Sequence, residues 1–184
     1  MKKVLLVGAA IAVMGTGSAG PQTIDRAGEA TAVTLLDDYA VRYDQAANDM
    51  AKGALRPERG RTLCTKLPFI SDRGAVHDWV GTVETLSSTG DGHGVLVVRI
   101  APHATVATTN NGLSESMTEF KTLIAPGSPV YKVAAALKEG QAVHFSGTLF
   151  PSKVDCLFET SLTMSGSMHE PNFLFRFSDV RPAE

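Results

Sequence analysis

The chain has 184 residues, of which 43% are hydrophobic and 20% charged, and its formal net charge is −2. This length suits one domain with an appended element, and the composition excludes a disordered or low-complexity chain. The acidic balance argues against a nucleic-acid-binding protein, because phosphate contacts need a basic surface.

Residues 1–19 have the layout of a secretory signal peptide. Two lysines, an apolar run over 5–15 and small residues at 16–19 follow one another. This order predicts cleavage after Ala19, with an uncleaved anchor as the alternative. The apolar run is shorter than the roughly 20 residues of a membrane span.

We therefore expect an exported protein, located in the periplasm or secreted, with no membrane span after cleavage. Removal of the two leading lysines leaves 15 basic against 19 acidic residues, a net charge of −4. Nucleic acid thus becomes a still less favoured partner.

The chain contains two cysteines, Cys64 and Cys156. In an oxidising compartment such a pair predicts a disulfide rather than a metal or catalytic site. The bond would close a loop of about 90 residues and stabilise the fold by about 4 kcal/mol in the chain-entropy model. Two buried free thiols are the alternative.

Residues 20–74 predict an N-terminal helical extension. Apolar residues recur at spacings of three and four over 23–52, the pattern of an amphipathic helix, and Gly53 suits its end. A second, short helix is expected over 56–68, with Pro57 at its first position. The apolar stripe of the first helix is expected to dock on the rest of the protein or to pair with a second copy. It consists of Val33, Leu36, Ala40, Tyr43, Ala47 and Met50.

From residue 75 to residue 184 the pattern changes to that of a β domain. A short helix is expected within it, because Ser128 can cap it, Pro129 suits its first position and Gly140 suits its end. Alternating or β-branched runs predict strands at 77–86, 95–102, 104–109, within 119–127, and at 141–150, 156–164 and 172–180.

Three strands, a helix and two further strands, with one extra strand between the last two, follow the element order of the OB-fold. The local sequences resemble this oligonucleotide- and oligosaccharide-binding superfamily: WVGTVETL (79–86) is similar to its first strand, and LKEGQAVHFSGTL (137–149) to its joint between helix and fourth strand. The resemblance covers about 77–181. The layout also resembles uncharacterised exported bacterial proteins with an OB-like domain.

The resemblance implies a mainly β protein with N-terminal helices and an OB-like small barrel over 75–184. In this family the helix between the third and fourth strands closes one end of the barrel. An antiparallel β-sandwich is the alternative fold.

The sequence contains no recognised catalytic or metal-binding motif. HExxH, GxSxG, a Walker loop and CxxC are all absent, so we expect no catalytic residue, metal or cofactor. Two loop histidines, His93 and His169, are the alternative source of a metal site. Serines near His169 and Glu170 are the alternative source of a hydrolase, although adjacent numbering does not create a triad. They are Ser161, Ser165 and Ser167.

Five side chains are candidates for ligand contacts: Arg99, Arg176, His93, His144 and Trp79. Each arginine is a cation on the polar side of a strand, where it would meet a carboxylate or phosphate, or else pair with Glu84 or Asp179. An exposed Trp79 would stack on a base or sugar. Its strand face is shared with Val83, however, which favours a core or rim position.

The sequence therefore favours a non-enzymatic, exported OB-fold binding module of the bacterial envelope. OB-folds bind through their second and third strands and the loops after strands one and four, here 87–109 and roughly 151–171. The acidic balance favours a protein or peptide partner. An oligosaccharide or single-stranded nucleic-acid binder on the same face is the first alternative. A hydrolase or metalloenzyme with a loop-assembled site, and a structural protein that dimerises through the first helix, are the others.

Overall fold

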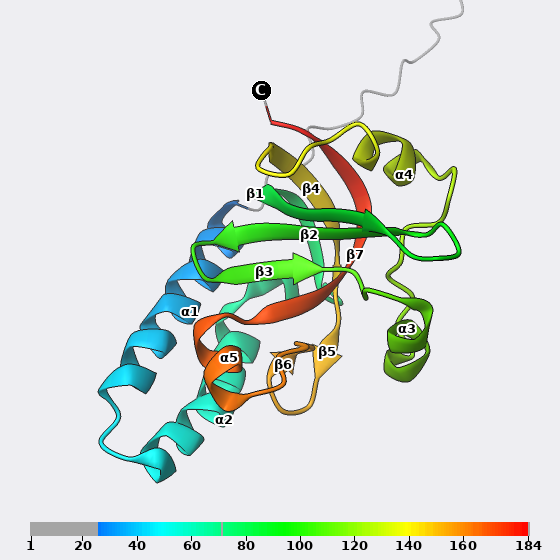
Figure 1. The fold of residues 1–184 in the computed structure, drawn as a ribbon. Coiled ribbons are helices and arrows are strands. Elements are labelled where there is room, and N and C mark those ends of the chain that lie inside the picture. The colour runs from blue at the N-terminus through cyan, green and yellow to red at the C-terminus, as the bar shows by residue number, and fades with distance from the viewer. Residues whose placement is uncertain (1–25, 71, 184) are drawn as a thin grey trace, which may run out of the picture.

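The computed structural model describes residues 26–70 and 72–183 (Figure 1). The predicted signal peptide, residues 1–19, lies outside the described residues. Within the described ranges, no helix has the combined length and hydrophobicity of a membrane span.

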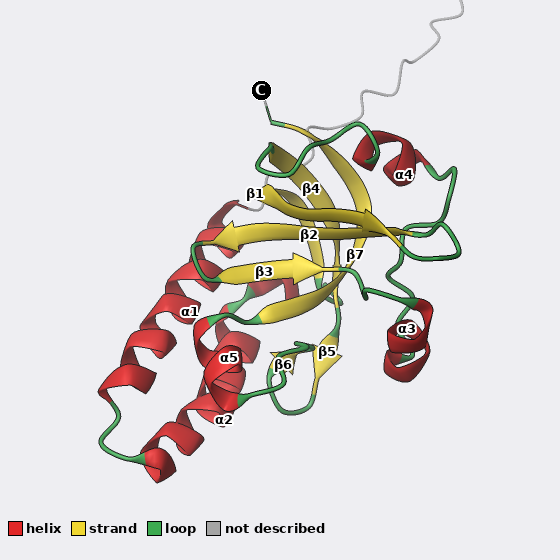
Figure 2. Cartoon of the chain, viewed as in Figure 1, coloured by secondary structure: helices red, strands yellow, loops and turns green. Residues whose placement is uncertain are grey.

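Five strands close into one β-barrel (Figure 2). Every neighbouring pair is antiparallel except β3 and β7, which run parallel, so the sheet is mixed. The order around the barrel is β1 (Ala75–Ser88), β2 (Gly94–Ala101), β3 (Ala104–Ala107), β7 (Asn172–Pro182) and β4 (Ala142–Leu149), which pairs again with β1. A mainly β fold with a small closed barrel is thereby confirmed, in a form compatible with an OB-like barrel rather than with a sandwich.

Alternating side chains fill the barrel. In β4, Phe145 and Leu149 are buried while the polar residues between them are partly exposed. Successive residues of a strand point to opposite faces, so the apolar set lines the interior. Phe145 is 0% exposed and meets the rings of Trp79, Phe175 and Phe177 edge-on.

The helix α4 (Pro129–Ala134) packs against β7 and β2. The Ser128 hydroxyl caps it by accepting a hydrogen bond from the backbone N–H of Tyr131 at 3.2 Å. Ala134 and Leu137 join the barrel core. The predicted helix between the third and fourth strands is thus confirmed, although it ends at Ala134, well before Gly140.

Two helices, α1 (Arg26–Gln45) and α2 (Asp49–Lys66), lie side by side on the side of the barrel away from α4 (Figure 1). Leu36 of α1 and Leu63 of α2 surround a small apolar void of about 10 Å³ together with Trp79 and Phe173 of the barrel. The helical region and the barrel therefore share one hydrophobic core, and a 3₁₀ turn, η1 (Pro68–Ile70), leads from α2 into β1.

The predicted helix boundaries in this region are wrong. The first helix ends at Gln45. Asn48 caps the second, because its side chain accepts a hydrogen bond from the N–H of Ala51 at 3.0 Å. Gly53 and Pro57 lie inside α2 instead of ending and starting helices, because the cap at Asn48 starts the helix before Gly53 and burial of Leu55 and Arg59 holds the residues around Pro57. Met50, predicted to be buried, is 89% exposed. The buried stripe of α1 is rotated relative to the predicted one and consists of Ala32, Leu36, Tyr39 and Tyr43.

Two predicted strands are also wrong. The region 119–127 follows a helix, α3 (Gly112–Thr118), and forms only an isolated bridge between Ile124 and Gly94. The region 156–164 contains only the two residues of β6 (Cys156–Leu157), which pair with β5 (Pro151–Ser152) in a short hairpin. It then enters α5 (Met164–His169), because the Thr163 hydroxyl accepts a hydrogen bond from Gly166 N–H at 2.9 Å and caps a helix.

Candidate functional site

The two arginines predicted to contact a ligand are both engaged within the protein. Arg99 forms a cross-strand ion pair with Glu84 at 2.8 Å and donates a hydrogen bond to the carbonyl of Pro102. Arg176 donates to the carbonyl of Lys121 at 2.6 Å and lies 5.0 Å from the centre of the Phe150 ring.

The other three predicted contact residues lie apart from these. His93 is 3.2 Å from Asp91 in the turn between β1 and β2, and His144 is 2.9 Å from Asp78. Trp79 is 1% exposed and packs in the core, so it cannot stack on a base or sugar. In the described part of the chain, the hydrogen bonds, ion pairs and ring contacts of these five residues go to other residues and join no two of the five.

The structure brings an aspartate of α1 next to a serine and a histidine that lie four residues apart in α5. Ser165 Oγ lies 3.1 Å from His169 Nδ1, and His169 Nε2 lies 2.8 Å from Asp44. Asp44 and His169 line an open groove that also contains Asp37 and Glu170 but not Ser165. An oxyanion formed near these carboxylates would be destabilised, so the arrangement lacks the electrostatics of acyl transfer. Among the described residues, no group of three or more His, Cys, Asp or Glu side chains is arranged to hold a metal ion.

A second groove lies between α2 and the connection from β4 to β7. We call it the α2 groove; its volume is about 440 Å³. It is lined by Gly53, Arg56 and Pro57 of α2 and by Val154, Asp155, Phe158, Glu159 and Met164 of the connection.

Charged groups that line the α2 groove neutralise one another. Arg56 donates to both carboxylate oxygens of Asp155, at 2.7 and 2.8 Å, and to Glu159 at 2.6 Å. The side chains of Asp155 and Glu159 are only 6% and 0% exposed. The hydrogen bond from Asp155 is the main cause that raises the pKa of Arg56. Both carboxylates are therefore occupied by protein groups.

Arg59, one turn from Arg56, is a fully buried cation. It donates hydrogen bonds to the carbonyl and the hydroxyl of Ser167, and its Nη2 lies 3.8 Å from a carboxylate oxygen of Asp155. Its Nε has no hydrogen-bond partner. Burial lowers the pKa of the Arg59 guanidinium, since it has lost water and shares its carboxylate with Arg56.

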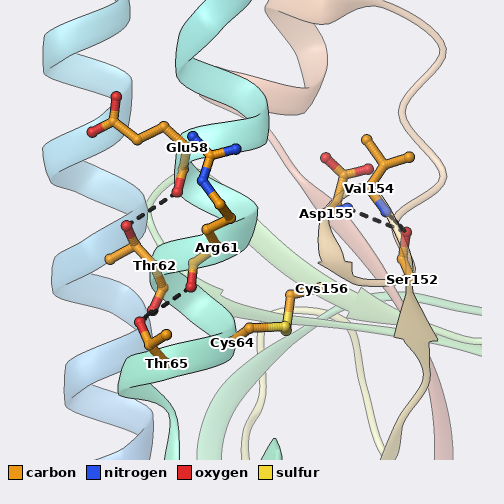
Figure 3. The surroundings of a disulfide bond; sticks show 9 residues. All are labelled: Glu58, Arg61, Thr62, Cys64, Thr65, Ser152, Val154, Asp155 and Cys156. Carbon is orange, nitrogen blue, oxygen red and sulfur yellow. Dashed lines mark hydrogen bonds between the residues drawn. A yellow bond between two sulfur atoms is a disulfide. The ribbon is translucent and has the colours of Figure 1, made fainter.

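The hairpin of β5 and β6 is pressed against α2. A Cβ atom at Gly60 would lie 2.4 Å from the carbonyl oxygen of Val154, so only glycine permits this close approach. The predicted disulfide between Cys64 and Cys156 is confirmed and bridges α2 and β6, with a Cα–Cα distance of 5.5 Å (Figure 3). The Ser152 hydroxyl accepts hydrogen bonds from the N–H groups of Val154 and Asp155 and shapes the turn.

Apolar side chains surround the opening of the α2 groove. Val154 is 60% exposed and Met164 is 38% exposed. Of the eight large hydrophobic residues that are exposed in the described part of the chain, four belong to the segments forming this groove: Met50, Val154, Leu162 and Met164. Gathered exposed apolar side chains mark interaction surfaces, and methionine adapts to varied partners.

One half of the predicted contact surface, 151–171, supplies a wall of the groove, whereas 87–109 does not. The sequence analysis missed the charged residues of the groove and of the adjacent core. The two arginines, Arg56 and Arg59, are about a hundred residues from Asp155 and Glu159, so the four form no local motif. The signal available was the cysteine pair, which brings the residues before Cys64 next to those around Cys156.

Comparison of the chain with protein-family models, with curated proteins and with solved structures found no match. The α2 groove is therefore the basis on which a function can be inferred.

Proposed function

We propose that this chain is an exported, non-enzymatic binding module of the bacterial envelope, related to OB-fold proteins, which binds a protein or peptide partner in the α2 groove. One observation carries the proposal: apolar side chains line the groove beside two carboxylates and an arginine that already neutralise one another. Such a groove accepts an uncharged apolar side chain better than a phosphate, because it offers no unengaged carboxylate and its arginine is already paired.

A protein partner fits the surroundings of the groove as well as the groove itself. Met50 and Leu162 are 89% and 100% exposed on α2 and on the β4–β7 connection, the two segments that supply the lining residues of the groove. Their burial by a partner would remove apolar surface from water, which is the main favourable term in protein association. An oligosaccharide or a single strand of nucleic acid would need several exposed aromatic rings, whereas Trp79 is buried and Phe158 is the one aromatic residue among the lining residues of the groove.

The disulfide supports export, because such bonds persist in oxidising compartments. Mass spectrometry of protein recovered from the periplasm and medium would test this part of the proposal. We expect a mature chain beginning at Gly20, as cleavage after Ala19 requires. Recovery of the uncleaved chain from the cytoplasm alone would contradict it.

Selection from a library of short linear peptides tests the binding role. The oxidised protein is the target, and Val154→Asp and Met164→Asp are the groove variants. Val41→Asp on α1 and Val133→Asp on α4 are matched controls, since both residues are exposed and lie outside the groove. We expect enriched peptides to share a bulky apolar residue and to bind the groove variants at least about tenfold more weakly than the controls. Peptides that bind groove and control variants equally, or no enrichment, would overturn the proposal.

A further inference from the structure

The disulfide lines a second cavity, separate from the α2 groove, which we call the disulfide cavity. This cavity, of about 330 Å³, is lined by both cysteines together with Ile70, Leu149 and Arg73. Cys64 is exposed, whereas Cys156 is 6% exposed. Exposed disulfides are the ones open to attack by a thiolate, while protected ones resist reduction. A thiol compound can therefore reach Cys64 through this cavity, where Ile70 and Leu149 provide apolar contacts and Arg73 a positive charge.

The hairpin of β5 and β6 separates this cavity from the α2 groove. Ser152 lines both, so the two spaces share a wall. Asp155, which accepts hydrogen bonds from Arg56 in the lining of the groove, directly precedes Cys156. A movement of the hairpin away from α2 would change the shape of the groove.

Two unfavourable features exist only while the hairpin and α2 are held together. Arg59 is buried without a partner for Nε, and the separation of α2 from α5 and the hairpin would return water to it. Cys156 has a φ angle of +66°, in the left-handed region that is unfavourable for a residue with a side chain. Because the disulfide holds the hairpin against α2, it prevents Arg59 from regaining water and Cys156 from leaving its unfavourable backbone conformation.

We infer that the Cys64–Cys156 bond is a thiol–disulfide exchange site for a dithiol reductant, and that its reduction moves the hairpin from α2 and alters the α2 groove. The inference rests on the proposed binding role of the groove for its biological meaning, but its structural part does not depend on a ligand. The reductant approaches Cys64 through the disulfide cavity, which both cysteines line.

The exchange proceeds in two steps. A thiolate of the dithiol attacks Sγ of Cys64, the S–S bond breaks, and Cys156 leaves as a thiolate that takes a proton from water. The second thiol of the reductant, after losing its proton, attacks the mixed disulfide and releases Cys64, which is then protonated. Two electrons pass to the protein disulfide, and the dithiol becomes a disulfide.

Methionine methyl NMR of the protein, with dithiothreitol as the dithiol, tests the inference. Met164 lines the groove and Met168 of α5 is buried against Tyr39 and Leu55 of α1 and α2, whereas Met117 lies exposed on α3 and serves as the control. We expect reduction without denaturant to shift the Met164 and Met168 methyl resonances and to leave Met117 in place. Unchanged fluorescence of the buried Trp79 would show that the barrel stays folded. A Met164 resonance that is the same in both redox forms, or a disulfide reduced only after unfolding, would overturn the inference.

The Arg59→Met variant tests the physical cause. It removes the buried cation and keeps much of its volume, so reduction should move Met164 clearly less than in the wild type. An equal shift in both proteins would overturn the assigned role of Arg59.

Peptides from the selection then separate the two proposals. We expect them to bind the reduced protein at least about tenfold more weakly than the oxidised protein. Equal binding to both forms would overturn the redox inference and leave the binding role standing, whereas a failed selection would leave the NMR result to decide the redox inference alone.

Discussion

The barrel and the junction between α2 and the hairpin of β5 and β6 bury different chemistry. The barrel interior is a set of aromatic and aliphatic side chains from strands paired on both edges. The junction contains the buried charged side chains of Arg59, Asp155 and Glu159, with the disulfide beside them. The barrel is therefore stabilised by apolar burial, which needs no particular partner, whereas the junction depends on a few hydrogen bonds and ion pairs that are lost when one partner is removed.

Truncation in the barrel should have the largest effect on stability. Phe145→Ala would remove a fully buried ring that contacts three other aromatic residues. We expect the free energy of unfolding to fall by about 4 kcal/mol, measured by urea denaturation. Thr148→Ala, a partly exposed neighbour on β4, is the control and should cost less than about 1 kcal/mol. Similar losses for both would contradict an apolar core centred on Phe145.

Removal of one charge from the junction should cost somewhat less. Asp155→Ala leaves Arg56 and Arg59 without their shared carboxylate, and we expect a loss of about 3 kcal/mol in the same assay. The exposed carboxylate of Asp179 provides the control, because Asp179→Ala should change stability by less than about 0.5 kcal/mol. Equal effects of the two variants would show that the junction charges are not coupled to folding.

A methyl group at the contact between α2 and the hairpin should have an intermediate effect. Gly60→Ala places a Cβ 2.4 Å from the Val154 carbonyl oxygen, so we expect a loss of about 2 kcal/mol. Gly53→Ala in the same helix has no heavy atom within 4 Å of the new Cβ. It should stabilise α2 by up to about 1 kcal/mol through helix propensity. Thermal denaturation of both variants checks the pair, and a destabilised Gly53→Ala would contradict the open space there.

The smallest effect is expected at the exposed link between α1 and α2. The hydrogen bond from Arg42 is the main cause that lowers the pKa of Glu58 below its usual 4.5. A lowered folded-state pKa means that this stabilisation is present above the unfolded pKa and is lost as the pH falls through the folded one. Wild type should therefore lose slightly more stability than Glu58→Gln between about pH 6 and about pH 3. Identical pH profiles of the melting temperature would contradict the shift.

Sequence periodicity predicted the barrel better than the junction. The alternation in β4 identifies Phe145 and Leu149 as core residues, and the Ser128–Pro129 start identifies α4. These signals are local, since a strand or helix repeats its pattern every two or three to four residues. The hairpin of β5 and β6 and the six-residue α5 are too short for such a pattern.

The sequence alone predicted the five barrel strands, together with two strands that do not form as predicted, the helix before β4 and the pairing of the two cysteines. It did so because apolar alternation, capping residues and a single cysteine pair each leave few alternatives. Only the tertiary structure shows that α2 continues through Pro57 and that Arg56 binds Asp155 and Glu159. It also shows that apolar side chains line the same groove. These outcomes depend on contacts between segments about a hundred residues apart, whose free energy exceeds the local preferences that a sequence displays.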